Sequence, residues 1–436
     1  MTRQMKTSGV EWIGNIPKKW NVFRIKNVAF LKGRIGWQGL KSDEYQEDGP
    51  FLVTGKDFKN GKIDWMSCVH ITEERFDEAP EIHIRENDLL ITKDGTVGKV
   101  AIAKNCPLKV SLNSGVLLIR SKNNSFFDQK FLYYVLCSNI FWMWFLSTLN
   151  GNSTIIHLYQ EDFSNFSFSL PPLSEQKEIA DYLDAKCAKI DTFIAKQKTV
   201  IEKLKEYKQS VITEAVTKGL NPAVPMKSSG VEWIGDIPEK WDVCKVINCL
   251  LNIGSGTTPQ GLEYYENEYI PWLNTGDLND AYIERTEKSV SEKALSDYSV
   301  LKRFDKGSVV VAMYGATVGK LGIVSFPLVT NQACCVMTPN EKLYNMFLFY
   351  LFMAGKTHLI SLSLGSGQPN INQNTVKTFD IPFPSFLEQK AIADYLDAKC
   401  AKIDTFIAKK QVVIEKLTEY KKSLIYECVT GKREIV

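Results

Sequence analysis

Two glycine-containing turns hold the residues that come closest to a phosphate-binding site. They read TKDGTVGK (92–99) and MYGATVGK (313–320). Neither meets the GxxxxGK[ST] pattern of a nucleotide-binding loop, because two and three residues separate the glycines and Val100 or Leu321 follows the lysine. The turns therefore predict no nucleotide site, although Lys99 and Lys320 suit phosphate contacts or structural work.

Other catalytic motifs are incomplete. An adenine methyltransferase needs Asn or Asp before Pro-Pro and an aromatic residue to grip a flipped-out base, and the tetrapeptide DIPF at 380–383 lacks one proline. The ExK-like tripeptides at 175–177 and 388–390 resemble part of a nuclease site. They fall at predicted helix starts, where capping and solvation explain them. The four histidines form no repeat-matched pair, so acid–base catalysis has no evident carrier.

Composition limits the other classes. The net charge of +3, from 53 Lys and Arg against 50 Asp and Glu, neither suggests nor excludes nucleic acid. The ten cysteines form no CxxC pair and no His has zinc-ligand spacing, so no metal site is predicted. Cys187 and Cys400 are expected to be buried thiols of a reduced, cytoplasmic chain.

No signal peptide is expected at the N-terminus. The uncharged stretch 131–149 is about long enough to cross a bilayer. Its counterpart near 343–364 is broken by Lys356 and His358, which favours a buried core helix over a membrane span.

The elements that position the polar turns occur twice. Residues 7–22 (TSGVEWIGNIPKKWNV) recur in similar form at 228–243, 221 positions on (228 − 7). Residues 177–196 recur at 390–409, 213 positions on (390 − 177), with only Glu178 changed, to Ala391. The stretches between these blocks barely agree. This pattern indicates one module duplicated in tandem, whose divergent parts are free to differ in what they bind.

Each repeat starts with an anchor that its prolines and tryptophans predict to be extended, and a mixed body follows. Residues 88–103 and 308–324 predict strand, glycine turn and strand, and 113–120 and 331–337 predict a further strand before an aromatic-rich helix.

After each body, Ser174, or Ser385 with Glu388, is expected to cap a helix of about 40 residues with a heptad seam. The two matching seams are expected to pack as an antiparallel pair. Gln197 and Lys410 interrupt the seams at matching positions, either as a register device or as a solvated defect.

The predicted fold class is α+β, with two mixed α/β domains separated by a pair of long antiparallel, coiled-coil-like helices in a pseudo-two-fold tandem repeat. The predicted parts are the N-terminal anchor and first body (1–171), the first long helix (172–218), a linker with the repeated anchor (219–240), the second body (241–383) and the second long helix with a tail (384–436).

The tandem GVEWIG-IP-W anchors, the divergent bodies with TVGK turns and the PPLSEQ-xIA-xYLD helices resemble the specificity subunit of type I restriction–modification systems, over essentially the whole chain. The resemblance implies two target recognition domains, each reading half of a bipartite double-stranded DNA target, with the helices as a ruler. It implies two modification subunits, which methylate adenine from S-adenosylmethionine, and restriction subunits that use ATP and Mg²⁺. The chain itself is then expected to be non-catalytic, to hold no cofactor and to bind no membrane.

Base-edge recognition needs amides, guanidinium groups and hydroxyls on loops held by a rigid scaffold. The predicted DNA-binding residues are Arg34, Trp37, Gln38, Thr54, Lys56, Lys93, Thr96 and Lys99 in the first body, and Ser255, Thr257, Thr258, Asn274, Thr275, Asp277, Tyr314, Thr317, Lys320 and Gln368 in the second. Only the TVGK turn and the Thr-Gly step (54–55 and 275–276) are expected at equivalent places. The unmatched residues are assigned to base readout, with simple surface exposure as the alternative for each.

Two other functional classes stay open. A self-contained methyltransferase or nuclease that carries these domains would act on DNA as a purified chain. A coiled-coil scaffold with carbohydrate- or protein-binding heads would not bind DNA even at low salt. The sequence does not reveal the target bases.

Overall fold

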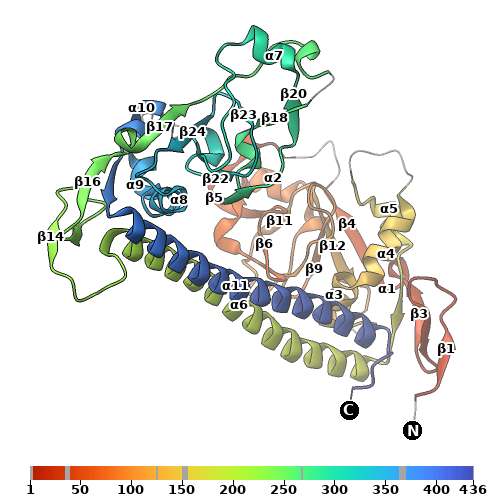
Figure 1. Cartoon of the computed structure of the whole chain (residues 1–436). Coiled ribbons are helices and arrows are strands. Elements are labelled where there is room, and N and C mark those ends of the chain that lie inside the picture. The colour runs from red at the N-terminus through yellow and green to blue at the C-terminus, as the bar shows by residue number, and fades with distance from the viewer. Residues whose placement is uncertain are drawn as a thin grey trace. The chain divides into compact units, whose positions relative to one another are not determined.

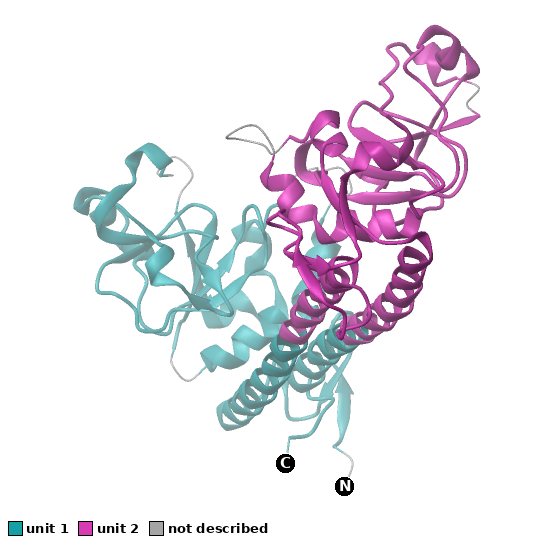
Figure 2. Ribbon diagram, turned by 60° about the vertical axis from the view of Figure 1, so that its left-hand side comes forward, with its two compact units in different colours: residues 1–197, 412–436 teal, residues 198–411 magenta. Residues whose placement is uncertain are grey.

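The computed structural model describes residues 3–34, 40–123, 126–149, 156–266, 269–362 and 370–435. The chain divides into two compact units (Figure 2): unit 1 comprises Met1–Gln197 with Val412–Val436, and unit 2 comprises Lys198–Gln411. Two long helices, α6 (Leu173–Lys218) and α11 (Phe386–Val429), each contribute to both units. At 46 and 44 residues they confirm the two predicted long helices.

The body of unit 1 contains two sheets (Figure 1). The larger has the order β4 (Ala29–Gly33), β12 (Val116–Ser121), β9 (Leu89–Thr92), β10 (Val100–Ile102), β7 (Lys62–Ile63) and β6 (Phe58–Lys59). The smaller has the order β11 (Val110–Leu112), β5 (Gln46–Val53) and β8 (Val69–His70). The short helices are α1 (Ile25–Val28), α2 (Glu73–Asp77), α3 (Gln129–Cys137), α4 (Asn139–Thr148) and α5 (Gln160–Ser164).

Both faces of the central strand β9 are buried. In β9, Leu89 and Ile91 belong to the core that includes residues of α3, α4 and α6, whereas Leu90 belongs to a second core with residues of β5 and β11. Alternate side chains of a strand point to opposite faces. Burial on both faces therefore explains why this strand is an unbroken apolar run rather than an alternating one.

Unit 2 repeats this architecture. Its larger sheet has the order β17 (Leu250–Gly254), β24 (Cys334–Pro339), β21 (Val309–Ala312), β22 (Leu321–Val324) and β19 (Ala281–Ile283). Its smaller sheet has the order β20 (Lys288–Val290), β18 (Ile270–Leu273) and β23 (Val329–Thr330). The short helices are α7 (Glu292–Asp297), α8 (Asn345–Ala354), α9 (Lys356–Ser361) and α10 (Gln373–Lys377). The predicted strand, turn and strand units are confirmed as the antiparallel pairs β9–β10 and β21–β22.

The anchors are hairpins, not the extended segments that were predicted. β1 (Met5–Thr7) pairs with β2 (Asn15–Pro17), and β14 (Met226–Ser228) pairs with β15 (Asp236–Pro238). Gly9 and Gly14 have φ of 73° and 72°, which lets the chain reverse between β1 and β2. The next strand in each unit, β3 (Asn21–Arg24) or β16 (Asp242–Lys245), pairs with the strand before the long helix, β13 (Ser167–Leu170) or β25 (Asp380–Phe383).

The apolar stretch 131–149 is two helices rather than the single core helix that was predicted. Ser138 ends α3 and caps α4, since its hydroxyl accepts the N–H of Ile140 at 3.2 Å. Most of their large side chains are buried in the core of unit 1. In the described residues no single helix is long and apolar enough to cross a membrane, although this pair, bent by 58°, meets the length and composition criteria together.

A buried glutamine joins each long helix to its body. Gln176 Nε2 donates to the carbonyl of Pro171 at 2.9 Å, and its Oε1 accepts the N–H of Asp128 at 2.8 Å. Gln389 makes the same bonds to Pro384 and Tyr344, at 2.9 and 2.8 Å. The two side chains are 1% and 0% exposed, so solvation does not explain the repeated Glu-Gln motif.

The two helix starts differ in their caps. The N–H of Glu388 donates to Oγ of Ser385 at 3.4 Å, so the predicted serine cap of α11 is confirmed. Ser174 instead lies inside the first turn of α6, because that helix begins at Leu173. The residue that corresponds to Ser385 is Pro172, whose carbonyl accepts the N–H of Gln176 at 3.0 Å.

Within each unit α6 and α11 run antiparallel. In unit 1 the Ser169 hydroxyl, just before α6, donates to the carbonyl of Val429 at 2.9 Å, and farther along α6 Asp191 pairs with Lys421 at 2.6 Å. In unit 2 Lys208 pairs with Asp404 at 2.7 Å. The predicted buried thiols lie in the seam, where Cys187 and Cys400 are each 5% exposed.

Candidate nucleic-acid interface

A carboxylate fixes the same turn in both units. After β5, the N–H and hydroxyl of Thr54 donate to Oδ2 of Asp57 at 2.7 and 3.0 Å. After β18, the N–H of Asn274 donates to Oδ2 of Asp277 at 2.9 Å. The backbone of the turn is therefore conserved between the units, while the side chains that it presents differ.

The two Thr-Gly steps were predicted to be equivalent, but the ends of the preceding strands show that they are not. β5 and β18 end at Val53 and Leu273, 220 residues apart (273 − 53). Thr54 therefore corresponds to Asn274 rather than to Thr275. The prediction was wrong by one position because the 221-residue offset of the anchors is not kept through the divergent body.

The TVGK turns join β9 to β10 and β21 to β22. In both turns the second glycine has a positive φ, 83° at Gly98 and 75° at Gly319. A Cβ on Gly98 would lie 2.8 Å from a ring atom of Trp142. The glycine thus serves a tight turn beneath an aromatic helix, which explains the motif without a nucleotide. Lys99 is exposed and Lys320 is half-buried.

In unit 1 the two turns line one cavity of about 650 Å³. Its walls are Tyr45, Thr54, Gly55, Lys56, Asp57, Ser67, Val69, Asp94, Gly95, Thr96, Lys99 and Asn113. Nδ2 of Asn113 donates to the Tyr45 hydroxyl at 3.3 Å, and Nζ of Lys99 lies 3.4 Å from the carbonyl of Gly55. The cavity therefore joins cationic, hydroxyl and amide groups, which can meet phosphates and base edges.

In unit 2 the corresponding segments are linked by hydrogen bonds. Nδ2 of Asn331 donates to Oδ1 of Asn274 at 3.1 Å, and the Thr258 hydroxyl donates to Oε1 of Gln332 at 2.8 Å. The TVGK turn begins beside the same segment, because the N–H of Met313 donates to the carbonyl of Ala333 at 2.8 Å. Three loops thus converge on residues 331–333.

The other predicted residues lie on these loops with varied exposure. Half-buried are Lys93, Ser255, Thr257, Thr275, Asp277 and Thr317, whereas Tyr314 is exposed. Trp272 Nε1 donates to the carbonyl of Thr257 at 3.1 Å, so the backbone of that residue has a structural role. Trp37, Gln38 and Gln368 lie outside the described residues.

Arg34 is not placed to read bases in this structure. It is 2% exposed, with Nε donating to the carbonyl of Leu112 at 3.0 Å and Nη2 to the Ser111 hydroxyl at 2.9 Å. Burial lowers the pKa of the Arg34 guanidinium, and the nearby Arg75 lowers it further. Its hydrogen bonds instead brace the strand before the Asn113 turn.

The predicted DNA-binding residues leave out several polar residues of the two clusters, among them Tyr45, Ser67, Asn113, Asn331 and Gln332. Asn113 and Asn331 were assigned only to the starts of predicted strands. Both lie just before a central strand, 218 residues apart (331 − 113), and each accepts a backbone N–H through its Oδ1. The repeated Asn was the available signal.

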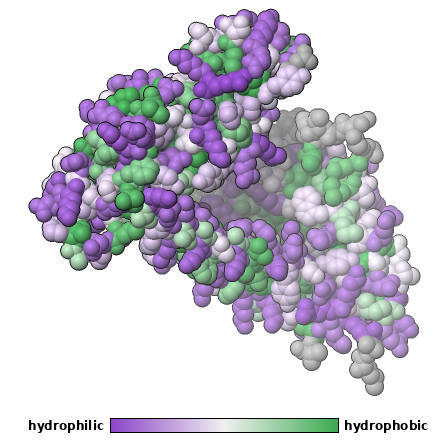
Figure 3. Space-filling view, in the orientation of Figure 1, coloured by the Kyte–Doolittle hydropathy of each residue, from purple (hydrophilic) through white to green (hydrophobic). Residues whose placement is uncertain are grey.

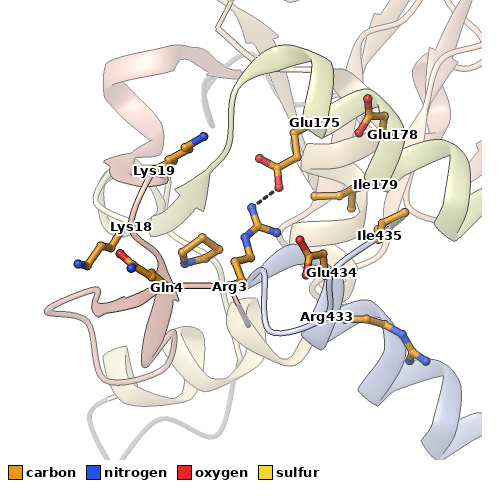
Figure 4. A pocket seen from close by; sticks show the side chains of 11 residues that line it. Arg3, Gln4, Lys18, Lys19, Glu175, Glu178, Ile179, Arg433, Glu434 and Ile435 are labelled. Atoms are coloured by element: carbon orange, nitrogen blue, oxygen red, sulfur yellow. Dashed lines mark hydrogen bonds and ion pairs between the residues drawn. The ribbon is translucent and has the colours of Figure 1, made fainter. Parts of the chain in front are cut away.

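A second cavity in unit 1, of about 530 Å³, lies beside the N-terminal hairpin, the start of α6 and the C-terminal tail (Figure 4). Arg3 forms an ion pair with Glu175, whose Oε2 also accepts Nε1 of Trp20 at 3.0 Å. Its walls carry both cations and carboxylates, with Lys18 and Lys19 on one side and Glu175 and Glu178 on another. These contacts fasten the hairpin to the helix and favour no one class of ligand.

Comparisons with known proteins agree over the length of the chain. A family model described as the type I restriction modification DNA specificity domain matches residues 17–203 and 238–416. The type I restriction enzyme MjaVIII specificity subunit of Methanocaldococcus jannaschii is 29% identical, over 96% of this chain and 93% of that protein. The EcoBI specificity subunit of Escherichia coli is 23% identical, over 99% and 90%.

Two solved structures share the fold. A chain from a study of complex assembly and conformational transition of the type I R-M system has a TM-score of 0.74 at 17% identity, covering 96% of this chain and 99% of that one. The HsdS subunit from Thermoanaerobacter tengcongensis has a TM-score of 0.52 at 18% identity, covering 96% and 98%.

Proposed function

Because the chain belongs to the family of type I restriction–modification DNA specificity proteins, we propose that its two bodies each read one half of a bipartite DNA target within a restriction–modification complex. The observation that carries this proposal is the duplicated polar cluster. Each unit holds the turn after β5 or β18, the TVGK turn and the Asn113 or Asn331 segment on the same scaffold, with different side chains. Two domains with the same backbone but different loop side chains are suited to recognising two different DNA sequences.

Within each cluster the contacts divide by chemistry. Lys99 and Lys320 follow the glycine of their turns and are assigned to phosphates, since a lysine carries charge but little base information. Polar groups that differ between the units, such as Thr54 with Lys56 and the loops around Thr258 and Thr275, are assigned to base edges.

We assign to the helix pair the role of setting the distance between the two half-sites. A helix of 46 residues spans about 69 Å at about 1.5 Å per residue. The ion pairs Asp191–Lys421 and Lys208–Asp404 are matching positions of the repeat, 213 residues apart (404 − 191 and 421 − 208). Each joins opposite charges at the seam, which favours one register of the pair.

A heptad-spaced aromatic stripe on each helix is assigned to docking the modification subunits. Phe193, Val200 and Tyr207 on α6 are 47%, 37% and 48% exposed, and their repeats Phe406, Val413 and Tyr420 on α11 are 56%, 37% and 49% exposed. Apolar and hydrophilic side chains alternate along the helix pair (Figure 3). Exposed apolar side chains that repeat at heptad spacing, with an aromatic residue at each end, favour a helix-binding surface over scattered exposure.

The duplication of these helix residues also fits the proposal of two modification subunits. Asp191 meets Lys421, which places Phe193 and Tyr420 at the same level of unit 1. Lys208 meets Asp404, which places Tyr207 and Phe406 at the same level of unit 2. Each unit thus carries one exposed Phe and one exposed Tyr at the same level of the helix pair, and two equal sets fit two copies of one partner.

The chain itself is assigned recognition without catalysis. S-adenosylmethionine would be bound by the modification subunits, and ATP and Mg²⁺ by restriction subunits. The test combines this chain, its modification subunits, S-adenosylmethionine and genomic DNA, and maps methylated adenines by sequencing. Methylation at one bipartite sequence by the complex, and none by the chain alone, is the expected result. Methyl transfer by the pure chain would instead indicate a self-contained enzyme.

A further inference from the structure

The strongest unassigned feature is an exposed glutamine in unit 2 whose amide is already held in place. Gln332 lies between β23 and β24, and its side chain is at the surface. Its Oε1 accepts the Thr258 hydroxyl at 2.8 Å. An exposed glutamine normally loses side-chain entropy when it binds, and a fixed amide loses less.

The residues on either side of this contact are also fixed. Asn331, the preceding residue, donates its N–H to the carbonyl of Leu273 at 3.0 Å and its Nδ2 to Asn274 at 3.1 Å. Its Oδ1 accepts the N–H of Ala333 at 3.0 Å. The backbone that carries Gln332 is therefore held on both sides, and Asn274 is engaged in holding it.

Aromatic side chains brace the loop that carries Thr258. Nε1 of Trp272 donates to the carbonyl of Thr257 at 3.1 Å, and the Tyr265 hydroxyl donates to the carbonyl of Pro259 at 3.0 Å. The N–H of Gln260 donates to the Tyr298 hydroxyl at 3.0 Å. Gly256 lies so close to β23 that a Cβ would be 1.8 Å from the carbonyl oxygen of Thr330.

We infer that Gln332 is a base-reading residue of the second half-site, and that Thr258 is the residue that positions it. This inference rests on the proposed function. With Thr258 on one lone pair, the amide keeps a second lone pair and two N–H donors. That set matches N6 and N7 of adenine in the major groove, where a glutamine binds both atoms together.

Unit 1 offers a natural contrast at the same position. Val116 and Cys334 occupy equivalent register positions in β12 and β24, each opposite the last residue of the neighbouring central strand. Counting back two residues, Ser114 corresponds to Gln332. The Ser114 N–H and hydroxyl lie 2.6 and 3.3 Å from Oδ1 of Asn113. The shorter side chain cannot make the paired adenine contact, so the two half-sites are read differently here.

The experiment uses the complex of the full chain with its modification subunits on the target found by methylation mapping. 7-Deazaadenine, which lacks the N7 acceptor, replaces each adenine of the second half-site in turn. One position should weaken wild-type binding roughly five- to 150-fold, the range of a good amide–adenine pair. In Gln332→Ala the native target should weaken to a similar degree, and the analogue at that position should cause no further loss.

Two variants sharpen the result. Thr258→Val keeps shape and removes the hydroxyl, so it should weaken binding at the same base and at no other. Gln332→Glu replaces the amide donor by an acceptor, so preference at that base should move from adenine toward cytosine. Ser114→Ala is the control in unit 1 and should leave the second half-site unchanged.

Unaltered preference at every second-half position in Gln332→Ala and Gln332→Glu, with first-half recognition intact, would overturn the inference alone. The inference would also be overturned if the binding loss caused by Gln332→Ala and the loss caused by 7-deazaadenine added fully when the two changes are combined. A wild-type complex with no bipartite preference would instead contradict the proposed function itself.

Discussion

The lysines of the TVGK turns follow the same glycine in both units, and their phosphate role stays a prediction. Lys99 is exposed and lines the cavity beside the turns of unit 1, and Lys320, half-buried, follows the matching glycine in unit 2. Lys99→Ala and Lys320→Ala should each weaken binding about equally across DNA sequences and reduce the salt slope of log K by about one. Titration of the complex at several salt concentrations measures this. Lys19→Ala in the anchor is the matched control, and a change in base preference would contradict the phosphate role.

Gln389 belongs to a motif that the sequence repeats, but its role in joining the long helix to the body is visible only in the structure. Gln389→Leu should lower the unfolding free energy by about 3 kcal/mol, because it leaves the N–H of Tyr344 and the carbonyls of Lys342 and Pro384 without their partner. Urea unfolding measures the loss. The exposed neighbour Lys390→Leu should stay within about 0.5 kcal/mol of wild type. If the two substitutions lowered the free energy of unfolding equally, Gln389 would not be the buried residue that fastens the helix to its body.

Among the elements, the repeated long helices could be predicted from the sequence, whereas their caps and the break in the aromatic helix could not. The heptad seam predicted both long helices, because apolar spacing alone specifies a helix with a partner. The predicted cap at Ser174 was wrong because α6 begins at Leu173, so Ser174 already lies in its first turn. The predicted single aromatic helix was wrong because Ser138 ends α3 and caps α4 within the apolar run. The loops proposed for base readout were the least predictable, since the residues that contact one another there lie far apart in sequence, as Thr258 and Gln332 do.

The docking stripe gives an element-scale prediction. Phe406→Asp places a charge in the proposed apolar patch of unit 2, so the complex should lose one modification subunit and keep the other. Native mass spectrometry counts the subunits directly. Phe193→Asp should remove the subunit at unit 1, and Lys402→Asp, an exposed change one turn away on α11, should remove neither. Retention of both subunits by both Phe variants would rule out the stripe as the docking surface.

At the scale of the whole molecule, both repeats contribute to both units. Inserting one heptad after Gln197 and one after Lys410 preserves the seam and lengthens the helix pair by about 10 Å. This corresponds to about three base pairs. The native target should then bind poorly, and the best remaining target should have a spacer about three base pairs longer, as selection from a randomised-spacer library would reveal. Binding could be lost altogether, because the half-sites also rotate about the DNA axis. Undiminished binding of the native spacing would show that the helices do not set the distance.

The central claim is that each body reads its own half of the target. Its most direct test replaces residues 23–170 by the corresponding body of a relative, such as the MjaVIII specificity subunit, and maps the methylated target of the reconstituted complex. One half-site should change to that of the relative while the other stays as it was, because each body has its own core. A simultaneous change of both half-sites would contradict it.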